Sequence, residues 1–255
     1  MALDLITIHC RADNYAFLIR DEAANATALI DVPEAAPILN ALAARGWKLD
    51  QILITHHHSD HIDGVAEVVA ATGAKVLGGK ADAHRLPHLD RALVEGDTVT
   101  VGAETGRVLD VSGHTVGHIA FYFADSGLAF TADSLMAGGC GRLFEGSPAL
   151  MWESLSKLAD LPGETLICSG HEYTASNLRF AASIEPDNAA LFARIDRVAR
   201  ARDEGRATVP SRLSGELATN PFLRARLPHL KALIGMPDAT DAQAFAELRA
   251  RKDHF

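Results

Sequence analysis

Cysteine is scarce in this sequence of 255 residues, and Cys10, Cys140 and Cys168 are widely spaced. Such spacing does not suit a disulfide framework, so we expect free thiols and a reducing compartment. Basic residues are also in deficit, because 24 Lys and Arg stand against 33 Asp and Glu, for a net charge of −9. That sign disfavours nonspecific nucleic-acid binding, but it allows an anionic small substrate where basic side chains gather locally.

Long apolar runs are missing as well, since none reaches the ~20 residues that a membrane helix needs. The first residues lack a basic leader and a cleavage pattern, so we expect no signal peptide and a cytoplasmic location. No internal repeat of solenoid period is present. The length fits one large domain or one domain plus a small appendage, and we expect a monomer without nucleic-acid or membrane partners.

The most informative stretch is Thr55-His56-His57-His58-Ser59-Asp60-His61, with four histidines and a carboxylate in seven residues. Neutral imidazoles and carboxylates are the ligands expected of zinc, iron or manganese. On an extended segment His56 and His58 point the same way and can hold one ion. Asp60 and His61 then close the turn and can reach a neighbouring ion. A His-rich surface loop is the alternative, but it gives no reason for alternating ligands that end in Asp-His.

The rest of the chain alternates strand and helix patterns up to about residue 172 and becomes helical after it. We expect strands over residues 5–8, 15–19, 28–32, 51–54, 75–77, 97–101, 107–111, 119–123, 128–131 and 165–168. Helical patterns cover residues 37–46, 62–72, 149–161, 175–184, 188–203 and 242–251. We therefore predict a mixed α/β domain over 1–172 and a helical domain over 173–255.

The pattern His-x-His-x-Asp-His after a buried strand resembles the signature of the metallo-β-lactamase superfamily. The resemblance implies an α/β (α+β) fold, an αββα sandwich, with two metal ions at its rim. It implies that His56, His58 and His114 hold one ion, while Asp60, His61 and His171 hold the other and Asp133 bridges both.

Three of these ligands lie far along the chain, each directly after an expected strand. Gly113 and Gly117 allow a tight loop around His114. Asp133 ends a strand, where a buried carboxylate needs a charge partner such as a metal ion. For Asp133 the alternative is a helix N-cap or an Asx turn, and for His171 an unrelated core histidine. His118 is expected to structure its loop rather than to bind metal.

Within that superfamily the chain resembles the hydroxyacylglutathione hydrolase (glyoxalase II) family, and the matching stretches run through nearly the whole sequence. They include Asp13-Asn14-Tyr15, Gly170-His171-Glu172-Tyr173-Thr174, Thr219-Asn220-Pro221-Phe222-Leu223-Arg224 and the terminal Arg249-Ala250-Arg251-Lys252-Asp253. The resemblance implies that the helical domain binds glutathione.

The substrate contacts carried over from the resemblance are Tyr173, Arg142, Phe144, Arg249 and Lys252. Arg249 and Lys252 would pair with the glycine carboxylate, and their spacing places them on one helix face. The alternative is a solvated basic helix end. Phe144 stands where the family often has a Tyr, so that hydroxyl is lost here. Cys140 is expected to be structural.

The implied reaction is hydrolysis of the thiolester S-D-lactoylglutathione to glutathione and D-lactate. Two divalent ions, expected to be zinc with iron or manganese as alternatives, would generate a bridging hydroxide. Asp60 would orient that hydroxide, and Asp133 would join the ions. The rival hypothesis is a glutathione-persulfide dioxygenase with a single iron. A noncatalytic metal-binding module is a third reading, from a different class.

Overall fold

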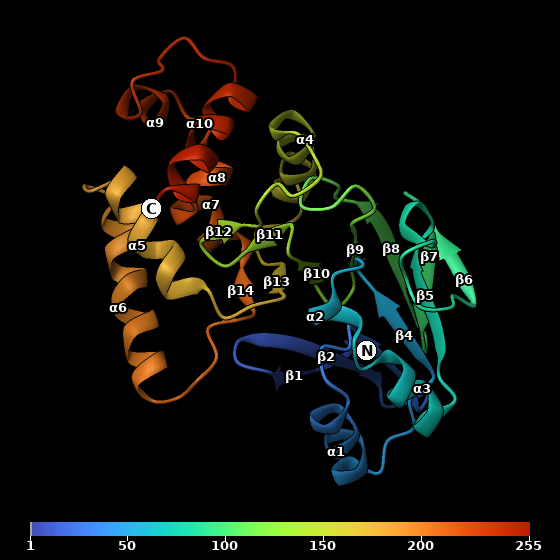
Figure 1. Cartoon of the computed structure of the whole chain (residues 1–255). Helices are drawn as coiled ribbons and strands as arrows, with labels where there is room; N and C mark the ends of the chain where they lie inside the picture. Colours follow the sequence, from blue (N-terminus) through green and yellow to red (C-terminus); the bar gives the residue numbers. More distant parts are fainter. Residues whose placement is uncertain (1) are drawn as a thin grey trace. The chain divides into compact units, whose positions relative to one another are not determined.

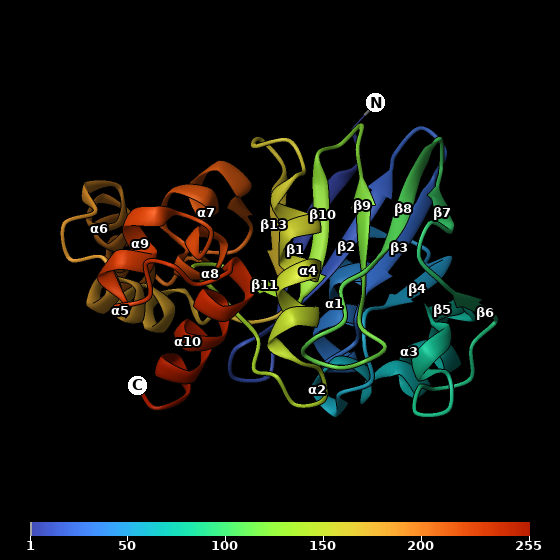
Figure 2. The ribbon, with the colours of Figure 1, turned by 90° about the horizontal axis from the view of Figure 1, so that it is seen from above.

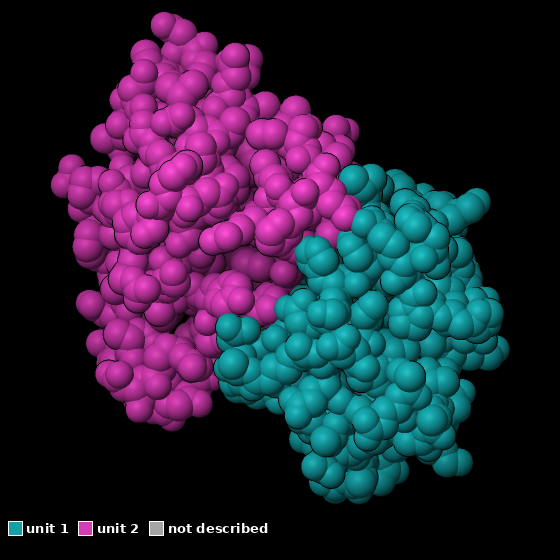
Figure 3. Space-filling model, viewed as in Figure 1, with its two compact units in different colours: residues 1–111, 116–132 teal, residues 112–115, 133–255 magenta. Residues whose placement is uncertain are grey.

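The computed structural model describes residues 2–255, and these fall into two compact units (Figures 1 and 3). Unit 1 comprises residues 1–111 and 116–132, and unit 2 comprises residues 112–115 and 133–255. The units divide the chain near residue 132 and not at residue 172, so they do not follow the predicted domains. No helix in the described part of the chain is long and apolar enough to cross a membrane.

Unit 1 contains two sheets. The first has the order β1-β2-β3-β4-β5-β6 and is made of Asp4–Cys10, Asn14–Asp21, Ala26–Ile30, Gln51–Ile54, Lys75–Gly79 and Arg91–Leu93. The second includes β10-β9-β8-β7, made of Leu128–Ala132, Ile119–Phe123, Glu104–Asp110 and Thr98–Val101. β1 to β3 pair antiparallel, whereas β3 to β6 are parallel.

The two sheets of unit 1 bury a shared aromatic core. Every residue of β2 is buried, as expected for a central strand with both faces covered. The Phe17 ring of β2 lies 5.6 Å from the Phe130 ring of β10, and Phe130 meets Phe123 edge-on. The two sheets therefore face each other and form the two inner layers of the predicted sandwich.

Helices cover the other face of the first sheet (Figure 1). They are α1 (Ala35–Arg45) and α3 (Val65–Thr72), while α2 (Ser59–Ile62) is a single turn. α1 ends at Gly46, whose φ of 64° is the left-handed conformation that favours glycine after a helix. The helix expected over 62–72 begins only at Val65, and residues 80–95, where no strand or helix was expected, contain a 3-10 turn (Lys80–Asp82) and β6.

Unit 2 begins with a small hairpin, β11 (Leu135–Met136) and β12 (Gly139–Cys140), followed by α4 (Pro148–Ala159) and β13 (Leu166–Ser169). Its helices gather into one group (Figure 2), made of α5 (Thr174–Ile184), α6 (Ala189–Asp203), α7 (Leu213–Thr219), α8 (Pro221–Arg224), α9 (Pro228–Leu233) and α10 (Asp241–Asp253). The expectation of no strand after residue 171 was wrong, because β14 (Ser211–Arg212) pairs with β13.

The helical group is tied to the hairpin through buried polar contacts. Asn220 Nδ2 donates to the carbonyl oxygens of Gly139 and Met136, and Glu216 accepts from the Gly138 N–H. Both side chains are fully buried. Buried polar groups are costly unless they are hydrogen-bonded, so these bonds specify how the helices and the hairpin pack.

Candidate metal centre and substrate contacts

The histidine-rich turn of unit 1 begins where β4 ends and reaches the first turn of α2. His56 is fully buried, and its Nε2 lies 3.2 Å from His58 Nδ1. Asp60 and His61 lie in α2, where Asp60 Oδ2 is 3.9 Å from His61 Nε2. The four candidate ligands of this turn are therefore close together, and each turns a nitrogen or oxygen atom toward another.

A buried carboxylate, Asp31, orients two of these histidines. Asp31 accepts hydrogen bonds from the Thr55 N–H, from Thr55 Oγ1 and from His61 Nδ1, each at 2.8 Å. Thr55 Oγ1 lies 3.0 Å from His56 Nδ1, so it accepts from His56 while donating to Asp31. Both imidazoles thus carry their proton on Nδ1 and leave the Nε2 lone pair for a ligand.

Other polar residues hold the remainder of the turn. Asn14 Nδ2 donates to the Asp60 carboxylate and to its backbone carbonyl, both at 3.0 Å. His57 Nδ1 lies 2.9 Å from Asp82, and the His118 ring stacks on His56 at 4.5 Å. His118 therefore packs against a predicted ligand, as a histidine that structures its loop would.

Unit 2 brings together the three candidate ligands that lie far apart in the sequence. Asp133 Oδ2 is 3.5 Å from His114 Nε2 and 3.3 Å from His171 Nε2. All three residues are buried. One carboxylate oxygen thus lies between two imidazole nitrogens.

Local packing sets the direction of His114. Its Nδ1 donates to the Arg142 carbonyl at 2.8 Å, which again leaves Nε2 as the acceptor. A Cβ atom at Gly141 would lie 2.1 Å from the Asp133 carbonyl oxygen and 2.8 Å from His114 Nδ1. Only glycine fits there, so the loop after β12 can approach both candidate ligands closely.

The predicted basic substrate contacts also lie together in unit 2. Arg249 is buried and donates to the Cys140 carbonyl and to Asp253, while Arg142 is exposed and its Nε lies 3.9 Å from Asp253. Burial, and then the nearby Arg249 charge, lower the pKa of Lys252. Basic side chains are thus clustered at the end of α10. Arg249 is buried, which does not fit the alternative of a solvated basic helix end.

The two predicted aromatic contacts each lie against a candidate ligand. Tyr173 stacks on His171 with ring centroids 4.7 Å apart, and 39% of its surface is exposed. Phe144 meets His114 edge-on at 5.2 Å and is 62% exposed. Exposed aromatic rings beside buried histidines offer a binding surface for a small molecule.

The cysteines are buried free thiols. Burial raises the pKa of Cys140 to about 11, even though Arg249 lies next to it. Burial likewise raises the pKa of Cys10 to about 12. At neutral pH these side chains are not thiolates and do not act as nucleophiles.

Sequence reasoning missed Asp31 and gave Asn14 no role. Asp31 was placed inside an expected strand, but β3 ends at Ile30 and Asp31 has a φ of 55°. A short polar residue tolerates that left-handed conformation, which turns the carboxylate toward the histidine turn. The sequence did contain a signal for this role, namely an aspartate at the end of a buried apolar run.

Comparisons with known proteins agree with this description. The metallo-β-lactamase superfamily model matches residues 13–171, and the model described as hydroxyacylglutathione hydrolase C-terminus matches residues 172–255. A hydroxyacylglutathione hydrolase of Cereibacter sphaeroides is 64% identical over 255 residues, which cover 100% of both chains. The His and Asp clusters of the chain are typical of a binuclear metal site in this fold.

Two solved structures share the fold. ETHE1 from Myxococcus xanthus is 23% identical, with a TM-score of 0.67 over 98% of this chain and 90% of that one. TTHA1623, solved in a di-iron-bound form, is 28% identical, with a TM-score of 0.57 over 66% of this chain and 91% of that one. From the full-length identity and the two adjoining family models, the chain belongs to the hydroxyacylglutathione hydrolase (glyoxalase II) family of the metallo-β-lactamase superfamily.

Proposed function

We propose that this protein hydrolyses S-D-lactoylglutathione to glutathione and D-lactate. The observation that carries the proposal is the 64% identity to a hydroxyacylglutathione hydrolase along the whole of both chains. The C-terminal family model adds to it, because it covers the part of the chain in which we expect glutathione to bind.

We further propose that the candidate ligands hold two divalent ions. His56, His58 and His114 would bind one ion, Asp60, His61 and His171 the other, and Asp133 both. The donor set fits, since it consists of imidazole nitrogens and carboxylate oxygens. The orientation of His56, His61 and His114, each bonded through Nδ1 with Nε2 facing another candidate ligand, supports the assignment. Zinc is the expected metal.

When bound, the ions would supply Lewis acidity and a nucleophilic hydroxide for the thiolester carbonyl. Asp60 would direct the nucleophile, and Asn14 would hold that carboxylate in place through its two hydrogen bonds. The departing thiolate needs little protonation, because a thiol is far more acidic than an alcohol. No general acid is therefore assigned.

The glutathione part of the substrate would lie over the basic cluster of unit 2. Lys252 and Arg249 would pair with its glycine carboxylate, and Arg142 and Tyr173 would contact its peptide groups. Phe144 would contribute contact area without a hydroxyl. Gathering positive charge here overcomes the repulsion expected between an anionic substrate and a chain with a net charge of −9. We also propose the division into a catalytic domain over 1–172 and a glutathione-binding domain over 173–255.

Steady-state hydrolysis of S-D-lactoylglutathione, followed by release of free thiol, tests the proposal when metal per chain is measured on the same sample. We expect turnover together with two ions per chain. Oxygen uptake with glutathione persulfide, one iron per chain and no thiolester hydrolysis would instead support the dioxygenase. Absence of both activities in a metal-loaded sample would contradict the proposed function.

We propose that the protein acts in the cytoplasm as a monomer. The support is chemical, since its three cysteines are buried free thiols, as expected in a reducing compartment. Light scattering of the purified protein tests the monomer, because a dimer would double the mass expected for a chain of 27.2 kDa.

A further inference from the structure

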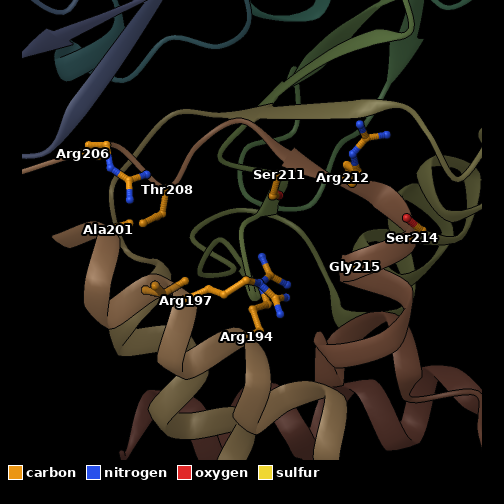
Figure 4. Close-up of a pocket in the computed structure, with 10 residues that line it drawn as sticks. Arg194, Arg197, Ala201, Arg206, Thr208, Ser211, Arg212, Ser214 and Gly215 are labelled. Atoms are coloured by element: carbon orange, nitrogen blue, oxygen red, sulfur yellow. The ribbon is translucent and has the colours of Figure 1, made fainter. Parts of the chain in front are cut away.

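A cavity of about 410 Å³ lies within unit 2, between α6 and the segment that leads through β14 into α7 (Figure 4). Four of its lining residues are arginines, Arg194, Arg197, Arg206 and Arg212, and no lining residue is acidic. Such a lining is unexpected in a chain with a net charge of −9. The predicted substrate contacts do not line this cavity, so it is separate from them.

Helical spacing explains the floor of the cavity. Arg194, Arg197, Val198 and Ala201 are spaced by three and four residues and share one face of α6. Val198 and Ala201 are buried and supply a small apolar surface between the charged side chains. Arg206 and Thr208 lie at one end of the cavity, and Arg212 lies at the other (Figure 4).

The arginines differ in how their charge is balanced. Arg194 is buried and forms an ion pair with buried Glu216 as well as a 2.7 Å bond to Thr219, so it is structural. Arg206 pairs with Glu204, and Arg212 pairs with Glu164. All four members of these two pairs are more than half exposed, and exposed pairs are weak enough for a stronger anion to replace them.

Arg197 is the fourth arginine that lines the cavity. It is exposed and has no acidic partner among residues 2–255, the part of the chain that the structure describes. Three guanidinium groups thus surround a small hollow with an apolar floor, and each can turn toward a bound ligand. Arginine matches the oxygens of phosphate with two parallel hydrogen bonds, and several arginines favour a dianion over a single carboxylate.

We propose that this cavity binds a small phosphomonoester, with the phosphate on Arg197 and Arg206 and the apolar part of the ligand against Val198 and Ala201. A volume of about 410 Å³ is at the small end of the range for small-molecule sites. The proposal goes beyond the hydrolase activity and does not depend on it. The site would serve binding alone, since none of its lining residues is a cysteine, a histidine or a carboxylate.

The test is calorimetric titration of the metal-loaded protein with phenyl phosphate as the probe. The variant Arg197→Gln/Arg206→Gln removes two charges from the cavity, and Arg200→Gln/Arg226→Gln removes two exposed charges elsewhere in unit 2. We expect the cavity variant to bind about tenfold or more weakly, and the control variant to bind like the unchanged protein. Equal melting temperatures would show that both variants fold.

Each other outcome overturns the proposal. Equal binding by the cavity and control variants would place phenyl phosphate on the metal ions or on diffuse surface charge. Equal loss in both would show a general effect of net charge. If no heat signal depended on Arg197 and Arg206, the cavity would not bind phosphate. If benzoate bound as tightly as phenyl phosphate, the cavity would be a carboxylate site.

Discussion

The two units supply their candidate metal ligands in contrasting ways. In unit 1 the candidate ligands His56, His58, Asp60 and His61 come from one turn, and it is held by hydrogen bonds from Asp31, directly after β3, and from Asn14, at the start of β2. In unit 2 the ligands His114, Asp133 and His171 come from separate loops and meet around one carboxylate. A contiguous turn needs few outside contacts to bring its ligands together, whereas separate loops depend on the packing of the whole unit.

The units also differ in what else they carry. All five predicted substrate contacts belong to unit 2, together with the arginine-lined cavity. Unit 1 contributes candidate metal ligands and the carboxylate of Asp31, which orients two of them. Changes in unit 1 are therefore expected to act through the metal, and changes in unit 2 through the metal or the substrate. Four predictions test this division, in order of decreasing effect.

The largest effect is expected from removing one metal ligand in either unit. His58→Ala should lose metal and activity together, with a fall in kcat/KM of more than ~100-fold, because the electrostatic stabilisation that bound metal supplies is lost. His114→Ala should also lose metal and activity together, because His114 is a proposed metal ligand. Each variant is assayed for thiolester hydrolysis and for metal content per chain. Full activity of either variant would remove its residue from the ligand set.

Asp31→Ala should weaken metal binding by ~10–100-fold, the usual cost of removing a residue that orients ligands. The affinity is measured by competition with a chelator, so the readout does not depend on activity. Asp82→Ala is the matched control, because Asp82 bonds His57, which is not a predicted ligand. Equal losses in the two variants would show a general packing effect instead.

Lys252→Ala should raise KM by about tenfold with little change in kcat, since it removes binding shared by substrate and transition state. Lys75→Ala is the control, because Lys75 is exposed at the start of β5 in unit 1. A fall in kcat alone, or normal KM, would contradict the assignment of Lys252 to glutathione. Arg249 is a poorer choice, since it also bonds Cys140 and Asp253.

The smallest effect is expected at Cys140. Its buried thiol has a pKa of about 11 and is protonated at neutral pH. Cys140→Ala should keep kcat/KM within about twofold and shift the melting temperature only slightly, because a small buried group is removed. Inactivation of the unchanged protein by a thiol reagent at pH 7, absent in the variant, would contradict the structural role.

Most of the elements of unit 1 could be predicted from the sequence, because strand runs such as 51–54 and 119–123 have clear apolar patterns. The first sheet keeps its strands in chain order, but the change from antiparallel to parallel pairing after β3 could not be predicted, because it depends on how the segment between β3 and β4 packs. Short elements were also missed, among them β6 and β14, because two or three residues carry too little pattern. The family resemblance supplied the fold that the patterns alone left open.

By itself the sequence determined which residues of the turn 56–61 are able to hold metal, because imidazoles and carboxylates at alternating positions are a chemical pattern that needs no coordinates. Tertiary structure alone decided that Asp31 orients His56 and His61, that Asp133 lies between two histidines, and that arginines of α6 face a cavity. Those facts depend on distances between segments remote in the chain, and only packing brings such segments together.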